Sequence, residues 1–418
     1  MELNNRHKIL LSAYACEPNK GSEPGVGWNW VIHLAEKYEV YVITRKNNQE
    51  PIEQFVRDNR LEHVQFYYHD CSKLWRKIKK FPNGIFLYYK KWQQEILPLA
   101  RTIVKKENIE LVHHVTFNEF RTPGKLYKLD VPFVWGPVGG GQFYRKEYRE
   151  VYFRKKDIVK ELVRNGINRY CLWGSKDIKN VIETASIILI ADQSTESIMS
   201  KKRSYVRLLE TAYNTERNGI KKYNKDADKP IKLLWVGGIW PRKGLKLLID
   251  ALGKTEFKDF ELNIVGDGED KKKCQLLVES YGMEDKIHFL GKMSYQQVNE
   301  QYEKADVFIF TSLRDTSGNV ILEAMSHGLP VITLDHHGAG EIVTNQTGIK
   351  ICYDSYDSVL KRLIAAIEKY KKEPKLMEIH GMAARKRIEE VYSWKYNMDK
   401  MCEVYSKVLN AVPKEGKI

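Results

Sequence analysis

Two carboxylates eight residues apart lie in the stretch TSLRDTSGNVILEAM, residues 311–325. Asp315 lies in a predicted loop after a strand, and Glu323 lies about one turn into a predicted helix. A carboxylate accepts several hydrogen bonds, which suits the neighbouring hydroxyls of a sugar or a ribose. The backbone N–H groups of residues 318–320, at the expected helix start, suit a phosphate. The alternative is an ordinary helix start with a solvated Glu323.

Two adjacent cations follow a second predicted strand, in the stretch WVGGIWPRKG over residues 235–244. Arg242 and Lys243 stand at the head of a predicted helix after a glycine turn. Two cations and a helix N-terminus together favour a diphosphate. The stretch lacks the Walker A spacing. Solvated cations are the alternative.

Two further segments of interest lie near the N-terminus. Residues 17–27 are predicted as a loop. The glycines of its part KGSEPGVG, residues 20–27, allow a ligand close to the backbone, unless they form an ordinary turn. His113 and His114 end a predicted strand in LVHHVTF. Adjacent strand residues face opposite sides of a sheet, so at most one of the pair is expected to line a site. A structural role is the alternative for both.

These residues need a scaffold of parallel strands, since ligands of doubly wound sheets bind beyond the carboxyl ends of the strands. The first 45 residues predict a βαβ unit. Further strands are predicted at 111–115, 132–135 and 186–191. A second series begins at 231, with strands at 232–236, 260–265, 286–290, 307–311 and 330–334 and helices at 245–252, 296–304 and 320–327. The polar stretch 214–229 separates the two series, which predicts two doubly wound α/β domains.

The composition supports globular domains and an anionic partner. The chain has 418 residues, of which 43% are hydrophobic and 29% charged, so a wholly disordered chain is excluded. The net charge of +15 favours a membrane surface, a nucleic acid or a phosphate-bearing substrate. The six cysteines, at 16, 71, 171, 274, 352 and 402, form no CxxC pair. We therefore expect a reducing compartment, no disulfide framework and no metal site.

The chain start loosely mimics a signal peptide, because Arg6 and Lys8 precede a short apolar run that ends in small residues. We favour a first buried strand over residues 9–14, because the run is short and leads directly into a glycine-rich segment. No apolar run reaches the length that spans a bilayer. A cytoplasmic protein is expected.

Two segments interleave cations with aromatic residues. Residues 73–92 contain seven Lys or Arg, no acid and six aromatics, and residues 143–156 contain six Lys or Arg and five aromatics. This composition suits an anionic bilayer interface. It would also suit single-stranded nucleic acid, which we favour less, or a pair of solvated helices.

Together these segments resemble the family 4 retaining glycosyltransferases of the GT-B fold. The resemblance covers nearly the whole chain and rests on YACEPNKGSEPGVGWNW (14–30), WGPVGGGQ (135–142), PRKG (241–244) and TSLRDTSGNVILEAMSHGLPVI (311–332). The last phrase matches the family's E-x7-E signature. The resemblance implies a fold of two Rossmann-like domains facing across a cleft, and a role in bacterial surface polysaccharide synthesis. It also implies transfer without a metal or cofactor.

The resemblance assigns roles to residues that match the family's motifs. Lys243 would bind the donor diphosphate, Glu323 the ribose and Asp315 the donor sugar. The backbone of Gly318, Asn319, Val320 and Ile321 would meet phosphate and sugar. Further matches are Gly25 and Gly27, which would close on the donor, Glu341 in GAGEIV near the donor, and His113 or His114 on the acceptor side.

Two departures from the family pattern affect this interpretation. Asp315 stands where the family usually has Glu, so its reach is shorter by one methylene. Gly238 stands where the family often has Arg. Either Arg242 supplies that charge from one turn later, or catalysis is expected to be weak.

The sequence therefore predicts an acceptor-binding domain over 1–212, a nucleotide-sugar-binding domain over 213–392, and a helix over 393–418 that crosses back to the first domain. The predicted activity moves a sugar from a nucleotide-sugar to a lipid-linked or saccharide acceptor at the inner face of the cell membrane. The rivals are a sugar-nucleotide epimerase of the same fold and a non-catalytic basic protein that binds lipid or nucleic acid.

Overall fold

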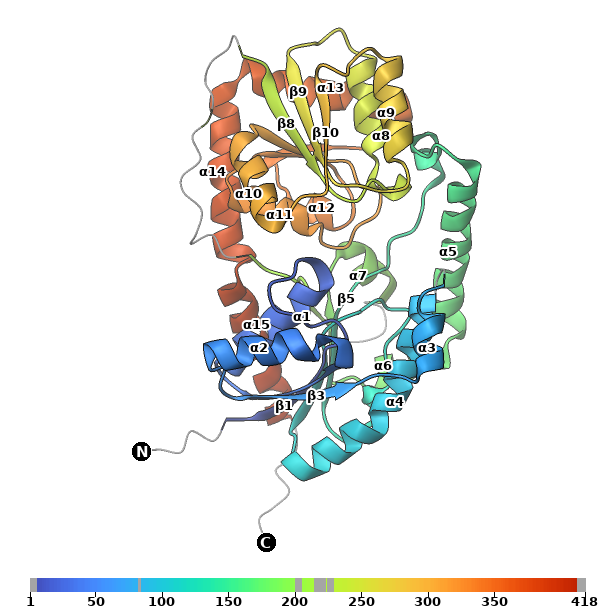
Figure 1. The fold of residues 1–418 in the computed structure, drawn as a ribbon, viewed down its shortest axis with the longest axis vertical. Helices are drawn as coiled ribbons and strands as arrows, with labels where there is room; N and C mark the ends of the chain where they lie inside the picture. Colours follow the sequence, from blue (N-terminus) through green and yellow to red (C-terminus); the bar gives the residue numbers. More distant parts are fainter. Residues whose placement is uncertain (1–5, 82–83, 200–204, 214–222, 224–228, 412–418) are drawn as a thin grey trace. The chain divides into compact units, whose positions relative to one another are not determined.

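The computed structural model describes residues 6–81, 84–199, 205–213, 223 and 229–411. The chain divides into two compact units, drawn in Figure 1. The first unit contains residues 1–141, 170–210 and 395–418, and the second contains 142–169 and 211–394. The predicted domain boundaries place 142–169 in the first domain, whereas these residues pack with the second unit. The polar stretch predicted to separate the domains lies mostly outside the described residues.

The first unit is built on a seven-stranded parallel sheet in the order β3-β2-β1-β4-β5-β6-β7. Its strands are short and mostly buried, as expected when helices cover both faces. The strands are β1 (Lys8–Ser12), β2 (Glu39–Arg45), β3 (Val64–His69), β4 (Leu111–His114), β5 (Phe133–Val138), β6 (Ile187–Ile190) and β7 (Tyr205–Arg207). The predicted buried first strand is confirmed, since Ile9, Leu10 and Leu11 are fully buried.

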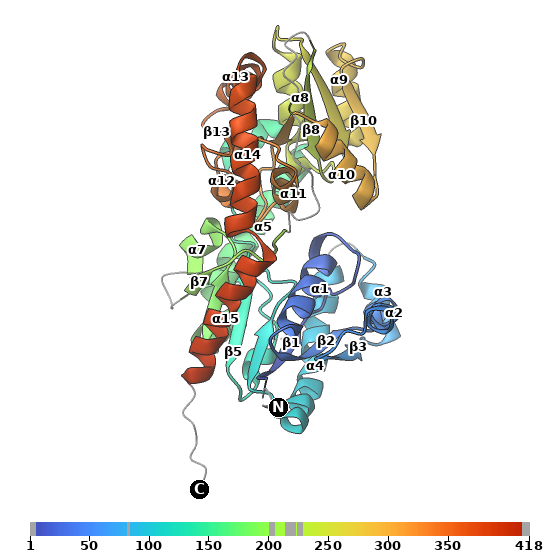
Figure 2. The same cartoon turned by 90° about the vertical axis from the view of Figure 1, so that its left-hand side faces the viewer.

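The helices of the first unit come from three stretches of the chain, within residues 22–107, 176–199 and 394–410. They are α1 (Ser22–Ala35), α2 (Gln49–Asn59), α3 (Lys73–Ile78), α4 (Gly84–Glu107), α6 (Lys176–Thr184), α7 (Gln193–Met199) and α15 (Trp394–Asn410), with short 3-10 turns at Lys46–Asn48 and Leu126–Lys128. Figure 2 shows α15 alongside the sheet of this unit. There the Tyr405 hydroxyl contacts His113 of β4, with 2.7 Å between the hydroxyl oxygen and Nδ1.

The second unit has a six-stranded parallel sheet in the order β10-β9-β8-β11-β12-β13. Its strands are β8 (Ile231–Val236), β9 (Phe260–Val265), β10 (Ile287–Gly291), β11 (Val307–Phe310), β12 (Val331–Leu334) and β13 (Gly348–Ile351). Its helices are α8 (Leu245–Gly253), α9 (Lys271–Ser280), α10 (Tyr295–Lys304), α11 (Asn319–Ser326), α12 (His337–Ile342), α13 (Tyr356–Lys372) and α14 (Pro374–Val391), with 3-10 turns at Lys146–Val151 and Pro241–Lys243. Helices α8, α9 and α13 share one hydrophobic core with the sheet (Figure 1).

Both sheets reverse their strand order beside their first strand, so each has a topological switch point. In the first unit it lies between β1 and β4, and in the second between β8 and β11. The loops after these strands are therefore where the fold places a ligand. Among the described residues no helix combines the length and apolarity needed to cross a bilayer. Helix α5 (Lys155–Gly174) contains residues of both units.

Candidate donor site at the switch point of the second unit

The loops after β8 and β11 are joined by hydrogen bonds. The Leu313 N–H donates to the Arg242 carbonyl oxygen at 2.8 Å, and the Thr311 hydroxyl donates to the Lys243 carbonyl oxygen at 3.2 Å. Gly244 permits this contact, because a Cβ there would lie 2.2 Å from the Thr311 carbonyl oxygen, and its φ is +67°. The sequence motifs PRKG and TSLRDTSG thus form one continuous surface.

Three charged side chains meet on this surface. Arg242 Nη1 donates to Asp315 Oδ1 at 3.0 Å, and Lys243 Nζ lies 2.5 Å from Asp315 Oδ2. All three side chains are at most one-third exposed. Burial alone would raise the pKa of Asp315, but the Lys243 and Arg242 charges hold it below its usual value. Burial lowers the pKa of Lys243, although Asp315 opposes that effect. Two cations against one carboxylate leave the cluster positive, which suits an anionic ligand.

Helix α11 begins beside this cluster and leaves its first turn without a side-chain cap. Gly318, at φ +62°, precedes the helix, and no side chain of the described residues accepts from the N-terminal N–H groups as a cap. The N–H groups at the start of a helix carry a partial positive charge. The helix start therefore adds donors for a phosphate to the two cations nearby.

Glu323 lies one turn into α11 and faces a tyrosine. The Tyr302 hydroxyl, from α10, donates to Glu323 Oε2 at 3.0 Å. Burial raises the pKa of Glu323, and the bond from Tyr302 partly offsets the rise. Sequence reasoning missed Tyr302, since nothing in its spacing connects it to residue 323.

A third loop, after β12, approaches the same place. Gly338 in α12 brings the helix against the Asp315 loop, because a Cβ there would lie 1.6 Å from the Thr316 carbonyl oxygen. Gln142 Nε2 donates to the Thr316 hydroxyl at 3.2 Å, so the end of WGPVGGGQ also reaches this loop. Glu341 lies in α12, where its carbonyl oxygen accepts from Arg387. The donor contact predicted for Glu341 stays a prediction.

His113 and His114 face opposite sides of the first sheet, as predicted, and both are fully buried. Besides Tyr405, His113 contacts the Gly136 carbonyl oxygen at 2.7 Å from Nε2. His114 Nε2 lies 2.8 Å from the Tyr89 hydroxyl. Burial lowers the pKa of His113 to about 3 and that of His114 to about 4, so both rings are neutral. These contacts favour the structural alternative, and the acceptor-side role remains untested.

The loop predicted at 17–27 is shorter than expected, because α1 begins at Ser22. Gly25 and Gly27 therefore lie in the helix. A Cβ at Gly25 would lie 2.0 Å from the Lys20 carbonyl oxygen, and a Cβ at Gly27 would lie 2.0 Å from that of Ala15. The lack of a side chain at both positions therefore leaves room for the chain's own backbone. Donor contact by Gly25 and Gly27 stays a prediction. Sequence reasoning missed Glu23, whose Oε1 accepts from the Phe117 N–H at 2.5 Å and whose pKa is raised by burial.

The two basic aromatic segments differ in the structure. In 143–156, Tyr144, Tyr148 and Tyr152 are buried in the second unit's core, so the prediction that these rings meet a bilayer is wrong. In 73–92, Tyr88, Tyr89 and Trp92 are likewise buried, whereas Leu74 and Phe81 are each 65% exposed.

Comparisons with known proteins agree with this architecture. Residues 216–387 match the family Glycosyl transferases group 1. An uncharacterized glycosyltransferase of Methanocaldococcus jannaschii is 26% identical over 195 residues, which are 46% of this chain and 48% of that protein. The lipopolysaccharide 1,6-galactosyltransferase of Salmonella typhimurium is 33% identical over 114 residues, 26% of this chain and 32% of that protein. The chain thus matches less than half the length of these relatives.

Solved structures match over nearly the whole chain. Sucrose-phosphate synthase of Thermosynechococcus elongatus has a TM-score of 0.66 at 16% identity and covers 97% of this chain and 100% of its own. The HepE protein of Anabaena, in complex with UDP, has a TM-score of 0.62 at 14% identity and covers 96% and 100%. The two parallel-sheet units therefore have the GT-B fold, as predicted. The family match, over residues 216–387, falls within the second unit.

Proposed function

We propose that this protein is a glycosyltransferase that uses a nucleotide-sugar donor. The observation that carries the proposal is the cluster of Arg242, Lys243 and Asp315 beside the uncapped start of α11. In the proposed reaction an acceptor hydroxyl attacks the anomeric carbon on the face that the diphosphate leaves, so the configuration is retained. The bond from that carbon to the diphosphate oxygen breaks, and the hydroxyl proton passes to that oxygen. Lys243, Arg242 and the α11 N–H groups stabilise the departing diphosphate.

The two carboxylates, Glu323 and Asp315, have separate roles in this proposal. Glu323 accepts hydrogen bonds from the ribose hydroxyls, and Asp315 turns from the cations toward the donor sugar when the diphosphate binds. The backbone from Gly318 to Ile321 meets phosphate and sugar. Transfer needs no metal or cofactor, so turnover is expected to persist in EDTA. Loss of turnover in EDTA, with recovery on adding magnesium or manganese, would contradict this part.

The direct test is product analysis after a binding screen. Thermal shift with nucleoside diphosphates and their sugars identifies the donor. Incubation with that donor and an acceptor extract is then expected to give free nucleoside diphosphate and a glycoside. An isomerised sugar nucleotide would instead identify the rival epimerase, and the absence of any nucleotide binding would favour the non-catalytic binding protein.

We further propose that the enzyme acts on a lipid-linked or saccharide acceptor in surface polysaccharide synthesis, at the cytoplasmic face of a membrane. Apolar and cationic side chains are exposed together on α3, on residues 80–81 that follow it, and on the start of α4. The apolar ones are Leu74, Phe81, Ile85, Phe86 and Leu87, and the exposed cations are Lys73, Arg76, Lys77, Lys80 and Lys90. Cations near an anionic surface contribute about 1 kcal/mol each.

Helix α5 supports the same proposal with a feature that the sequence analysis missed. Apolar side chains at helical spacing are about half exposed or more, at Val159, Leu162, Val163, Ile167, Tyr170 and Trp173. A contiguous exposed apolar stripe of this kind marks an interaction surface. Its aromatic end, Tyr170 and Trp173, suits the headgroup region of a bilayer.

Vesicle sedimentation tests the membrane proposal. Wild type is expected to bind phosphatidylserine vesicles at low salt and to dissociate as the salt rises. Neutralising Arg76, Lys77, Lys80 and Lys90 should release it without affecting donor hydrolysis. The matched control neutralises four exposed lysines of the second unit, at 258, 272, 361 and 369. Failure of the wild type to bind anionic vesicles at low salt would overturn the proposal.

A further inference from the structure

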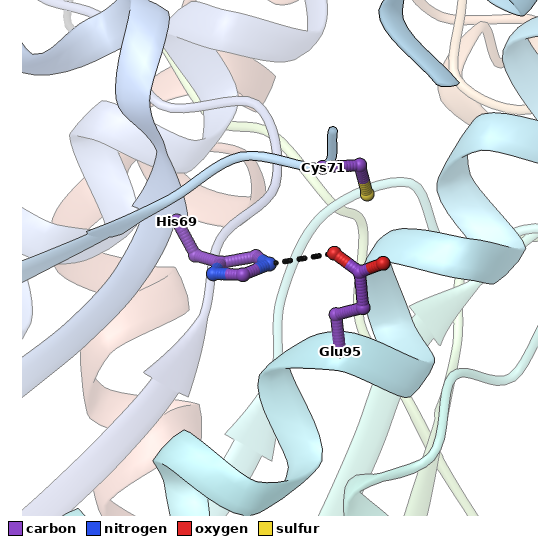
Figure 3. Close-up of side chains that lie close together, drawn as sticks. All are labelled: His69, Cys71 and Glu95. Carbon is purple, nitrogen blue, oxygen red and sulfur yellow. Dashed lines mark hydrogen bonds and ion pairs between the residues drawn. The ribbon is translucent and has the colours of Figure 1, made fainter. Parts of the chain in front are cut away.

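Three side chains of types that bind transition metals meet in the first unit, outside the elements of the proposed reaction. His69 ends β3, Cys71 follows two residues later, and Glu95 lies on α4 (Figure 3). His69 Nε2 lies 3.1 Å from Glu95 Oε2. The three candidate ligand atoms, counting the Cys71 sulfur, all lie within 4.8 Å of one another.

The surrounding contacts fix the backbone that carries these side chains. Trp92 on α4 donates its indole N–H to the His69 carbonyl oxygen at 3.0 Å, one helical turn before Glu95. Residues three apart on a helix share a face, so this bond aims Glu95 at the end of β3. Asp70 Oδ1 accepts from the Cys71 N–H at 3.1 Å, which orients the turn that carries the thiol.

The spacing of these atoms is close to what one metal ion requires. Zinc binds imidazole nitrogen, thiolate sulfur and carboxylate oxygen at about 2.0–2.3 Å in a tetrahedron, whose edges are then about 3.3–3.6 Å. One of the three edges is already 3.1 Å, and small side-chain rotations would bring the others into range. The mixed nitrogen, sulfur and oxygen set favours zinc-class ions over magnesium or calcium, which prefer oxygen ligands.

The site is accessible and its charges can change on binding. The side chains of His69 and Glu95 are about one-quarter exposed, which gives an ion a route to the buried Cys71. A metal–sulfur bond would form with release of the Cys71 thiol proton to water. Lys91 Nζ lies 3.4 Å from Glu95 Oε1 on a flexible stem and would yield its place beside the carboxylate to the ion.

We propose that His69, Cys71 and Glu95 bind one zinc-class divalent ion, which ties the end of β3 to α4 and leaves a fourth position for water. The alternative is a hydrogen-bonded triad that binds no metal. The proposal does not rest on the proposed glycosyl transfer, since all three ligands belong to the first unit and the cations assigned to the donor belong to the second.

Metal titration of the full chain tests the site. Protein stripped with a chelator is dialysed against Zn²⁺, and bound metal is measured by elemental analysis. One zinc per chain is expected, with a rise in Tm of about 5–10 °C at a hundredfold excess of Zn²⁺ over its Kd. Co²⁺ is expected to give the near-ultraviolet absorption of a cobalt–thiolate bond together with intense visible bands.

Single variants separate this site from adventitious binding. Cys71→Ser should remove the cobalt–thiolate absorption, and His69→Gln and Glu95→Gln should each weaken Zn²⁺ binding at least tenfold. The matched controls are Cys352→Ser, which removes an exposed thiol, and Glu62→Gln, which removes an exposed carboxylate. Both controls should bind like wild type. Far-UV circular dichroism identifies any variant that fails to fold. If the other variants fail to fold, zinc binding by Glu95→Gln, which changes a partly exposed side chain, tests the proposal.

Wild type that retains no zinc, or unchanged zinc binding in folded Glu95→Gln and His69→Gln, would overturn the proposal and leave the triad as a hydrogen-bonded structure. Loss of the cobalt signal in Cys352→Ser would place the metal elsewhere and would also overturn it. None of these readouts uses turnover, so failure of the metal site and failure of the proposed transferase activity are distinguishable.

Discussion

The two switch points of the molecule have the same strand order but differ in charge, since one carries charged side chains and the other neutral ones. Between β8 and β11, two cations and a carboxylate lie beside an uncapped helix start. At the other switch point, between β1 and β4, strand β4 ends in the neutral rings of His113 and His114. These rings form hydrogen bonds with Tyr405, Gly136 and Tyr89 of the same unit. The same strand order therefore supports a cluster of charged side chains beside a helix start in one unit and a pair of buried, neutral rings in the other.

The comparison shows that topology alone does not make a binding site. In the second unit, Gly244 lets the loop after β8 lie against the backbone of Thr311, and Gly318 precedes α11 with a positive φ. In the first unit, Gly25 and Gly27 are used for packing of the chain against itself. A binding site requires loops whose small and charged residues are not already used to pack the chain against itself.

The largest expected effect is at Lys243. Lys243→Ala removes a charge-assisted bond to the diphosphate and should weaken nucleoside diphosphate binding by about 10- to 100-fold. Isothermal titration calorimetry measures the affinity, and Lys272→Ala, at an exposed lysine of the same unit, is the control. Equal affinities in Lys243→Ala and wild type would contradict the proposal that this switch point binds the diphosphate.

The second expected effect separates the carboxylate from the cations. Asp315 competes with a diphosphate for Lys243 and Arg242, so Asp315→Asn should leave nucleoside diphosphate affinity unchanged or tighter. Turnover should fall by about tenfold, because the lost charge faces the donor sugar in the transition state. Asp315→Glu restores the charge with a longer reach and serves as the comparison. If Asp315→Asn lost affinity and kept kcat, the assignments of Asp315 and Glu323 would have to be exchanged.

The third effect concerns the closed switch point and is expected in acid stability. His113 stays neutral when folded, with a pKa of about 3, but takes up a proton near pH 6.5 when unfolded. The unfolded state therefore binds more protons between these values, and stability is lost as the pH falls below about 6.5. His113→Gln should reduce this loss by up to about 1.4 kcal/mol per pH unit in denaturant unfolding.

His288→Gln, in β10 of the second unit, is the control for the effect of a His-to-Gln substitution outside the first unit. An unchanged slope in His113→Gln would mean that the ring is not held neutral. A folded His113→Gln protein that binds nucleotide but transfers no sugar would restore the acceptor-side role.

The smallest effect is expected at Glu323, whose raised pKa links donor binding to pH. Ribose hydroxyls donate to the ionised carboxylate, so affinity should fall as the pH drops and Glu323 takes up a proton. Tyr302→Phe removes a bond that stabilises the ionised form, and it should weaken nucleotide binding about three- to tenfold, more at pH 5 than at pH 8. Glu323→Gln should bind weakly with little pH dependence. A Tyr302→Phe protein with the wild-type pH profile would contradict this linkage.

The sequence predicted the sheets and the charged loops well because both depend on local signals. The strand predicted at 260–265 is β9, and PRKG and TSLRDTSG lie side by side as their positions after neighbouring strands require. Tyr302 could not be predicted, because its partner lies on another helix whose packing no local pattern reports. The same reason hid the meeting of His69 and Cys71 with Glu95, which depends on how α4 packs against the end of β3.

The position of Tyr405 has a consequence for how the chain is made. Residues reach the ribosome exit in order, and the second unit has all its residues once position 394 has been added. The first unit, although synthesised earlier, lacks the helix that covers His113 until α15 emerges. During synthesis the later unit can therefore close around its core first, while the earlier one keeps an apolar face of its sheet open to chaperones.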